Sequence, residues 1–186
     1  SPITRVNGFW RLDVKIENHE VKDAHSSGIF FRGIETILHG RDPRDAVYLT
    51  ERICGICSTA HAMASSLALE DAFHVEPPRN GIIIRNLIFG ADLLQNHIRH
   101  FYFLTLPDFA PGPNEPPFVP SYEVDFRLSK AQNEALYKNY MESIHISRAA
   151  HDLVTIFGGK IPHNHGIVAG GATVPPSGDN VRQFLS

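Results

Sequence analysis

Two long stretches with helical periodicity constrain the fold of this chain more than any other feature. In residues 79–106 and 129–157, apolar residues recur at the spacing of one helix face. Both stretches are far longer than an average globular helix of about 11–12 residues. Gly158 and Gly159 follow the second stretch, and glycine commonly ends a helix. Helices of this length bury their apolar faces against each other, so the sequence predicts a bundle of long helices.

The residues within and after the first stretch refine this prediction. Charged and polar side chains interrupt the apolar pattern, so we expect a buried bundle helix and no direct membrane span. These side chains are Arg85, Asp92, Asn96, His97 and Arg99. Residues 107–117, between the two helices, are rich in proline, which lacks the backbone N–H of regular structure. We expect an irregular loop there.

The N-terminal part of the chain has the period of a β-strand. Apolar residues alternate with charged residues from Trp10 to Glu17, which is typical of a strand with one buried face. A turn then leads into a second short strand at residues 21–24, and this predicts a β-hairpin over residues 9–26. We therefore expect an α+β protein, mostly helical, in which the hairpin packs on the bundle of long helices.

The motif that carries chemistry lies at residues 52–61 and reads Arg-Ile-Cys-Gly-Ile-Cys-Ser-Thr-Ala-His. It holds the only two cysteines of the chain, Cys54 and Cys57. If a helix starts near Gly55, then Cys54, Cys57 and His61 lie within a wedge of roughly 60° on one helix face. The helix N-terminus would also favour thiolates over thiols, and thiolates bind soft metals. The three side chains are therefore candidate metal donors.

Other interpretations of the two cysteines remain open from the spacing alone. Cys-x-x-Cys also occurs in dithiol redox sites, in structural zinc sites and as two buried small residues. A dithiol site should follow a buried strand, whereas residues 42–45 (Asp-Pro-Arg-Asp) open a helix and predict helices across residues 43–74. This argues against dithiol chemistry. Zinc would need a fourth ligand, for which the candidates are His97, His100, His163 and His165.

The cysteine motif belongs to a long series of motifs in a fixed order. Residues 32–35 (Arg-Gly-Ile-Glu), 41–45 (Arg-Asp-Pro-Arg-Asp) and 52–57 come before His61. The series continues at both ends with residues 2–6, 85–87, 100–102 and 156–163. Together these residues resemble the N-terminal signature of nickel–iron hydrogenase large subunits. The resemblance implies that residues 1–186 are a single N-terminal portion of a larger domain with the hydrogenase large-subunit fold.

The resemblance also implies a reaction and a set of ligands. In this family, a nickel–iron centre cleaves dihydrogen reversibly and heterolytically into protons and electrons, and its iron carries cyanide and carbon monoxide. By position in the motif, Cys54 is expected to be a terminal nickel thiolate and Cys57 a thiolate that bridges nickel and iron. Soft thiolates suit both metals. The chain would thus supply two of four cysteine ligands.

Three further residues are expected to support this centre. Arg52 is adjacent to the cysteines, where its charge favours thiolate. His61 is expected to hydrogen-bond a cysteine sulfur rather than to bind a metal directly. The resemblance assigns Glu35 as a ligand of magnesium or a similar hard cation. The residues alone favour an ion pair of Glu35 with Arg32 or Arg52 instead.

The remaining ligands and the electron acceptor are expected from other protein. The family has a second Cys-x-x-Cys near its C-terminus, and this chain has no further cysteine. The sequence begins without methionine and stops where a helix starts, near residues 177–180, so we expect the C-terminal half from a continuation or from a separate chain. The resemblance also implies a small subunit with iron–sulfur clusters. It would face the irregular stretch 160–171, which contains His163 and His165.

One residue departs from the family pattern. After Thr-Arg-Val the family has a glutamate that passes protons to and from a nickel cysteine, and Asn7 occupies that position here. An amide can hydrogen-bond but does not titrate near neutral pH. We therefore expect a different proton route, an impaired activity, or a purely hydrogen-bonding role for Asn7. The candidates for a replacement acceptor are Glu51, Asp45, a histidine or an ordered water.

Two other classes of function stay open. One is a non-catalytic or sensory hydrogenase-like subunit, which Asn7 favours weakly and the two retained cysteines argue against. The other is a small zinc-stabilised interaction module. Nucleic-acid binding is not expected, because the net charge is −3 and the basic residues are scattered along the chain.

Overall fold

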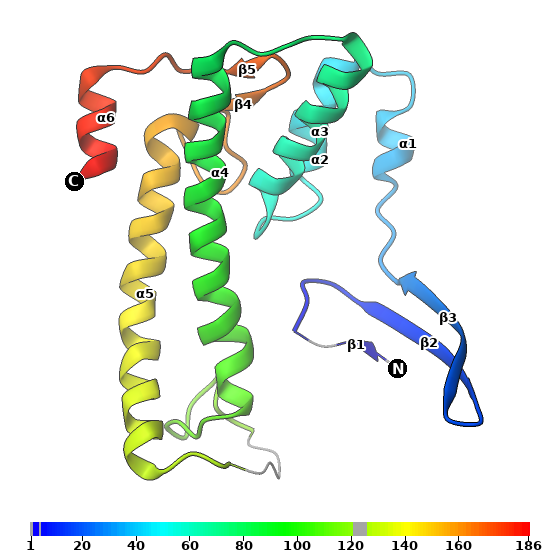
Figure 1. Ribbon diagram of the computed structural model, residues 1–186, viewed down its shortest axis with the longest axis vertical. Helices are drawn as coiled ribbons and strands as arrows, with labels where there is room; N and C mark the ends of the chain where they lie inside the picture. Colours follow the sequence, from blue (N-terminus) through cyan, green and yellow to red (C-terminus); the bar gives the residue numbers. More distant parts are fainter. Residues whose placement is uncertain (1, 4, 121–125) are drawn as a thin grey trace. The chain divides into compact units, whose positions relative to one another are not determined.

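The computed structural model describes residues 2–3, 5–120 and 126–186 of the chain (Figure 1). Thr4, which belongs to the first of the family motifs, lies outside the described residues. The chain divides into two compact units, Ser1–His39 and Gly40–Ser186. The expected packing of the hairpin on the helices, and the union of both units in one domain, stay predictions.

The first unit is a small antiparallel sheet followed by a short helix. Its elements are β1 (Pro2–Ile3), β2 (Trp10–Glu17), β3 (Glu20–Gly28) and α1 (Ile34–Leu38), with strand order β1-β2-β3. The predicted hairpin is confirmed, and Asn18 and His19 form its turn with φ values of 52° and 64°. The second strand is longer than expected, because Ser26 stays in the sheet and accepts a hydrogen bond from Trp10 Nε1 at 2.6 Å.

The second unit begins with the helices that flank the two cysteines. They are η1 (Pro43–Asp45), α2 (Ala46–Glu51) and α3 (Ser58–Phe73). The side chain of Asp42 accepts a hydrogen bond from the N–H of Arg44 at 2.9 Å, and Pro43 takes the first helical position. The helix start predicted from this stretch is therefore confirmed. At the other end, His74 adopts a left-handed φ of 55° and closes α3.

Two long antiparallel helices form the body of this unit. α4 (Arg79–Arg99) runs beside α5 (Lys130–Gly158), which confirms the predicted bundle (Figure 1). The first stretch is not one uniform helix, because η2 (His100–Thr105) has π-helical geometry and η3 (Leu106–Asp108) is a 3-10 turn. Pro107 has no N–H to continue α-helical bonding, so the helix changes geometry as it approaches this residue. Among the helices of the described residues, none combines the length and the apolar character needed to cross a membrane.

The core of the second unit lies where the long helices meet a small C-terminal hairpin. The remaining elements are β4 (Ile167–Val168), β5 (Gly171–Ala172) and α6 (Gly178–Leu185). The core residues are Val47, Ala62, Ile84, Ile88, Ala91, Val154, Phe157 and Ile167. A Cβ on Gly166 would come within 2.3 Å of the carbonyl oxygen of Phe157, so only glycine permits this close approach. The stretch 160–171, expected to be irregular, thus contains part of a hairpin held tightly against α5.

Candidate metal centre

A tight turn between α2 and α3 brings Cys54 and Cys57 together. The backbone N–H of Cys57 donates to the sulfur of Cys54 at 3.3 Å. The N–H of Cys54 donates to the carbonyl of Glu51, the last residue of α2, at 3.4 Å. Cys54 is buried, Cys57 is half-buried, and both are free thiols. Two sulfur donors therefore share one small site at the entrance to α3.

This turn differs from the helix that the sequence suggests. α3 begins at Ser58, with Cys57 as its N-cap residue, and not near Gly55. The prediction that Cys54 shares a helix face with Cys57 and His61 is therefore wrong, because Cys54 precedes the helix. The N–H of Cys57 bonds a sulfur instead of a helical carbonyl, and glycine next to Cys54 disfavours helix. The turn, rather than helical spacing, brings the sulfurs together.

The thiol of Cys57 is poorly ionised in the metal-free chain. Burial, together with the hydrogen bond and the charge of Cys54, raises the pKa of Cys57 to about 12. The expectation that the helix N-terminus favours thiolate is thus wrong for Cys57 without metal, because burial penalises the charged form more strongly. A metal that binds here must displace a proton from sulfur. Its affinity should rise with pH.

We expect Cys57 of the metal-free protein to react slowly with iodoacetamide, because only the thiolate is nucleophilic and little forms near neutral pH. Its modification rate, followed by mass spectrometry, should still be rising at pH values where an ordinary thiol of pKa about 8.5 has levelled off. The protein unfolded in urea is the control, in which both cysteines should react at the ordinary rate. Equal rates for folded and unfolded protein would contradict the raised pKa.

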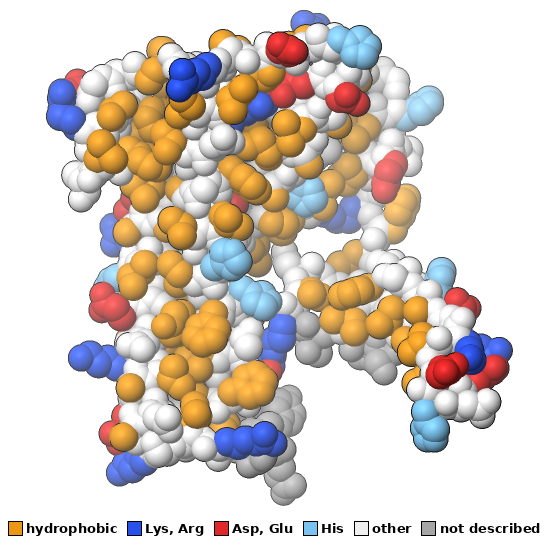
Figure 2. All heavy atoms as spheres, viewed as in Figure 1, with side chains coloured by type: hydrophobic (Ala, Val, Ile, Leu, Met, Phe, Trp, Pro, Cys, Tyr) orange, Lys and Arg blue, Asp and Glu red, His pale blue; other side chains and the backbone are white. Residues whose placement is uncertain are grey.

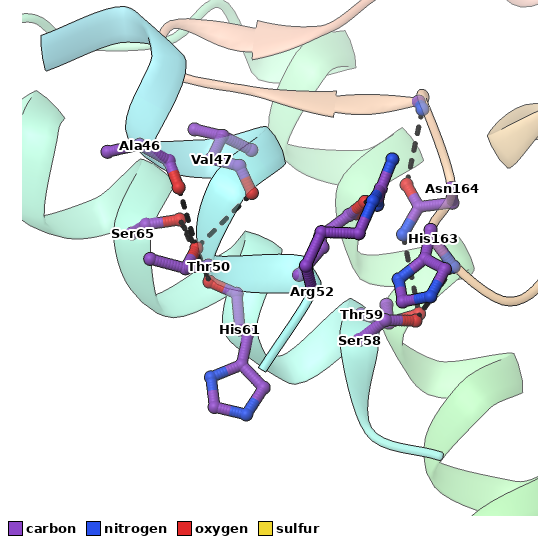
Figure 3. Close-up of polar contacts among 12 residues, drawn as sticks. Ala46, Val47, Thr50, Arg52, Ser58, Thr59, His61, Ser65, His163 and Asn164 are labelled. Carbon is purple, nitrogen blue, oxygen red and sulfur yellow. Dashed lines mark hydrogen bonds and ion pairs between the residues drawn. The ribbon is translucent and has the colours of Figure 1, made fainter. Parts of the chain in front are cut away.

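His61 lies in the first turn of α3, and its backbone helps to join α3 to α2. Its carbonyl oxygen accepts hydrogen bonds from Ser65 Oγ at 2.9 Å and from Thr50 Oγ1 at 3.5 Å. Figure 3 shows the ring of His61 pointing away from this group of hydrogen bonds. Burial lowers the pKa of His61, which favours a neutral imidazole with one N–H to donate. The expected hydrogen bond from His61 to a cysteine sulfur stays a prediction.

Glu51 and Arg52 form an ion pair directly before the cysteine turn. Arg52 Nη1 lies 3.2 Å from Glu51 Oε2, and the Glu51 side chain is fully buried. Burial raises the pKa of Glu51 to about 7, although Arg52 acts in the opposite direction. Among the described residues, Glu51 Oε1 has no hydrogen-bond partner. Of the two carboxylates suggested as replacement proton acceptors, Glu51 is thus buried beside the cysteines and Asp45 is exposed.

The segment after α5 packs against the start of α3 (Figure 3). The N–H of His163 donates to Ser58 Oγ at 2.9 Å. Asn164, which is fully buried, donates through Nδ2 to Thr59 Oγ1 at 3.3 Å. The sequence singled out His163 for its position in the family pattern, but it gave no sign that Asn164, Ser58 and Thr59 join these two segments. The first turn of α3 is therefore fixed from the far end of the chain.

The other two predicted site residues lie in the first unit. Asn7 is exposed in the bend between β1 and β2, and Glu35 is exposed in the first turn of α1. The two units are described separately, so the roles of Asn7 and Glu35 beside the cysteines stay predictions. Within the described residues, no group of three or more His, Cys, Asp or Glu side chains could hold a metal ion. The two soft sulfur donors fit one half of a thiolate-bound metal centre.

Comparison with known proteins identifies the family. The sequence model described as nickel-dependent hydrogenase matches residues 32–114 and 109–184. The chain belongs to the nickel-dependent hydrogenase family. All of this hydrogenase-family chain aligns with the periplasmic NiFeSe hydrogenase large subunit of Desulfomicrobium baculatum at 45% identity, covering 38% of that relative. It is also 32% identical to the quinone-reactive Ni/Fe-hydrogenase large chain of Wolinella succinogenes, over 92% of this chain and 38% of the relative.

Solved structures confirm the hydrogenase large-subunit-like fold. A chain of the Ni-Fe-Se hydrogenase from D. vulgaris Hildenborough matches all of this chain with a TM-score of 0.86 and 48% identity. The match covers 39% of that chain. The NiFeSe hydrogenase of Dm. baculatum matches with a TM-score of 0.84 and 43% identity. The hydrogenase-family chain therefore spans about two fifths of the length of the relatives it matches.

Proposed function

We propose that this chain is the N-terminal portion of a nickel–iron hydrogenase large subunit that cleaves and forms dihydrogen by a heterolytic route. The observation that carries the proposal is the cysteine turn, which lies inside the segment matched by the nickel-dependent hydrogenase family. In this proposal Cys54 would be a thiolate ligand of nickel, and Cys57 would be a thiolate ligand of the nickel–iron centre. The two thiolates are half of the four cysteine ligands.

When bound, the nickel–iron centre supplies a soft, redox-active site where dihydrogen separates into protons and electrons. Cys54 and Cys57 hold the metals, and the pair of Arg52 with Glu51 supports the turn that carries them. Glu51 also has the properties of a proton acceptor, because its carboxyl is buried and has a pKa of about 7. The proposal includes cyanide and carbon monoxide on iron, and magnesium at Glu35.

The other half of the centre comes from protein beyond these residues. The match with this chain covers only 38% of the length of each of the two relatives named above. Figure 2 shows hydrophobic side chains exposed over α4 and α5. Leu93 and Leu94 of α4 are among the exposed residues. Exposed apolar surface of this kind favours contact with further protein. We assign that protein to the C-terminal half of the large subunit, as a continuation or a separate chain, and to an iron–sulfur small subunit.

Metal analysis of the complete protein, purified with its partners, tests this function. Nickel and iron together, with hydrogen uptake that is lost when the metals are removed, would support the hydrogenase. Zinc alone would support the interaction module instead. A protein without metal that still assembles with its partners would favour a non-catalytic relative.

Replacing Asn7 with glutamate is expected to raise the rate of proton–deuterium exchange, or to leave it unchanged, in the complete enzyme. A carboxylate at this position restores a titratable group, which an amide cannot provide. Exchange of deuterium gas with water protons, followed by mass spectrometry, measures the rate. Asn7→Gln is the matched control, because it lengthens the side chain without adding an acid. A large loss in Asn7→Glu alone would show that the amide has a role of its own.

A further inference from the structure

Asp92 and Gln95 are two polar side chains on the buried side of α4. Only 2% of the surface of Asp92 is exposed, and Gln95 is fully buried. Together with the core residues Ile88 and Ala91, they follow the i, i+3, i+4, i+7 spacing of one helix face. Asp92 therefore interrupts the apolar pattern of this helix at a position inside the protein, where polar atoms need hydrogen-bond partners.

Each of these side chains has one buried oxygen that finds no hydrogen-bond partner within the described part of the chain. The two oxygens are Asp92 Oδ1 and Gln95 Oε1. An amide oxygen accepts hydrogen bonds and never donates them. Burial raises the pKa of Asp92 to about 6, so at neutral pH most of this carboxyl is ionised and also only accepts. The two oxygens therefore cannot satisfy each other, and both need a donor.

The helix brings the two side chains within reach of one small donor. Both belong to the α-helix Arg79–Arg99, and residues three apart in an α-helix have Cβ atoms about 5–6 Å from each other. Gln95 is held in place from the neighbouring helix, because its Nε2 donates to Ser147 Oγ on α5 at 3.2 Å. This bond uses the amide nitrogen of Gln95 and leaves its oxygen for another partner. One molecule that donates twice can therefore serve both oxygens.

We propose that Asp92 and Gln95 hold one buried water molecule, which donates one hydrogen bond to Asp92 Oδ1 and the other to Gln95 Oε1. Buried waters in proteins typically bond polar groups that have no other partner. A hard cation fits less well, because it takes six or more oxygen ligands and the described residues offer two unpartnered oxygens on this face. The water links Asp92 through Gln95 to Ser147 on α5. This site goes beyond the proposed function, since it involves neither the cysteines nor a metal.

A crystal structure of the complete large subunit with its small subunit tests this site. The expected result is an ordered water at a hydrogen-bond distance of about 2.7–3.2 Å from both Asp92 Oδ1 and Gln95 Oε1. A second crystal is soaked in a rubidium salt, because rubidium scatters anomalously and replaces a bound monovalent cation. An anomalous peak between the two oxygens would overturn the inference in favour of a cation. Two oxygens with no water between them would overturn it as well.

Gln95→Met and Asp92→Leu each remove one acceptor and keep a side chain of similar size, so each should lose the water. Asn96→Ala is the matched control, because Asn96 lies on the same helix and its Nδ2 donates to the backbone carbonyl of Asp92 at 2.9 Å. This control should retain the water. A water that persists in Gln95→Met or in Asp92→Leu would contradict the assigned partners. If a variant does not fold, the parent structure decides, since it must contain the water.

Discussion

Replacing Cys54 or Cys57 with serine is expected to abolish nickel binding and hydrogen uptake by the complete protein. A serine hydroxyl stays protonated and offers a hard oxygen, whereas nickel and iron in this setting require a soft thiolate. The two sulfurs also belong to one turn, in which Cys57 donates its N–H to the sulfur of Cys54. Nickel and iron content, and uptake of dihydrogen with an artificial electron acceptor, measure the effect.

The serine variants should lose the metals without losing the fold. In Cys54→Ser, the new hydroxyl can still accept the N–H of Cys57, so the turn keeps an acceptor at this position. Ile56→Val is the matched control, because it alters the residue between the cysteines and removes no donor. It should retain both metals and activity. Normal hydrogen uptake in either serine variant would contradict the prediction that the substituted cysteine is a metal ligand.

The local features of the fold follow from the sequence. The ends of α5 are an example, since Ser129 and Gln132 form a capping box and Gly159 ends the helix with a φ of 76°. The helix start at Asp42 and Pro43 is another. In each case, neighbouring residues supply the hydrogen bonds or backbone angles that decide the structure. Such features are readable without knowledge of distant contacts.

The candidate site could be predicted only in part, because its details depend on distant contacts. The sequence identified Cys54 and Cys57, but the turn between them depends on a sulfur acceptor that helical spacing does not reveal. The raised pKa of Cys57 comes first from burial, which exists only in the folded chain. The sequence shows Asp92 as a polar interruption of a helix, but its burial, with 2% of its surface exposed, depends on contacts from other parts of the chain.

Replacing Glu70 with glutamine is expected to destabilise the protein by about 3–5 kcal/mol, since it leaves the charge of Arg85 buried without its partner. Glu70 on α3 and Arg85 on α4 are both buried and form a two-pronged ion pair, with Arg85 Nη2 at 3.2 Å from Glu70 Oε2. Glu70 Oε1 also accepts the N–H of Gly170 at 2.8 Å. Urea denaturation of the complete large subunit, followed by circular dichroism, gives the free energy of unfolding.

Asp179→Asn is the control for this prediction, because it removes the acid of the exposed ion pair with Arg182 and should change stability little. An equal effect of both substitutions would contradict a structural role for Glu70.

Replacing Glu70 with glutamine should also weaken metal binding at the cysteine turn. Glu70 anchors Gly170, and the same C-terminal segment fixes the first turn of α3 through His163. Glutamine leaves a single oxygen for both Arg85 and Gly170, so this support of the cysteine turn weakens and Glu70→Gln should release nickel at lower urea concentrations than the control.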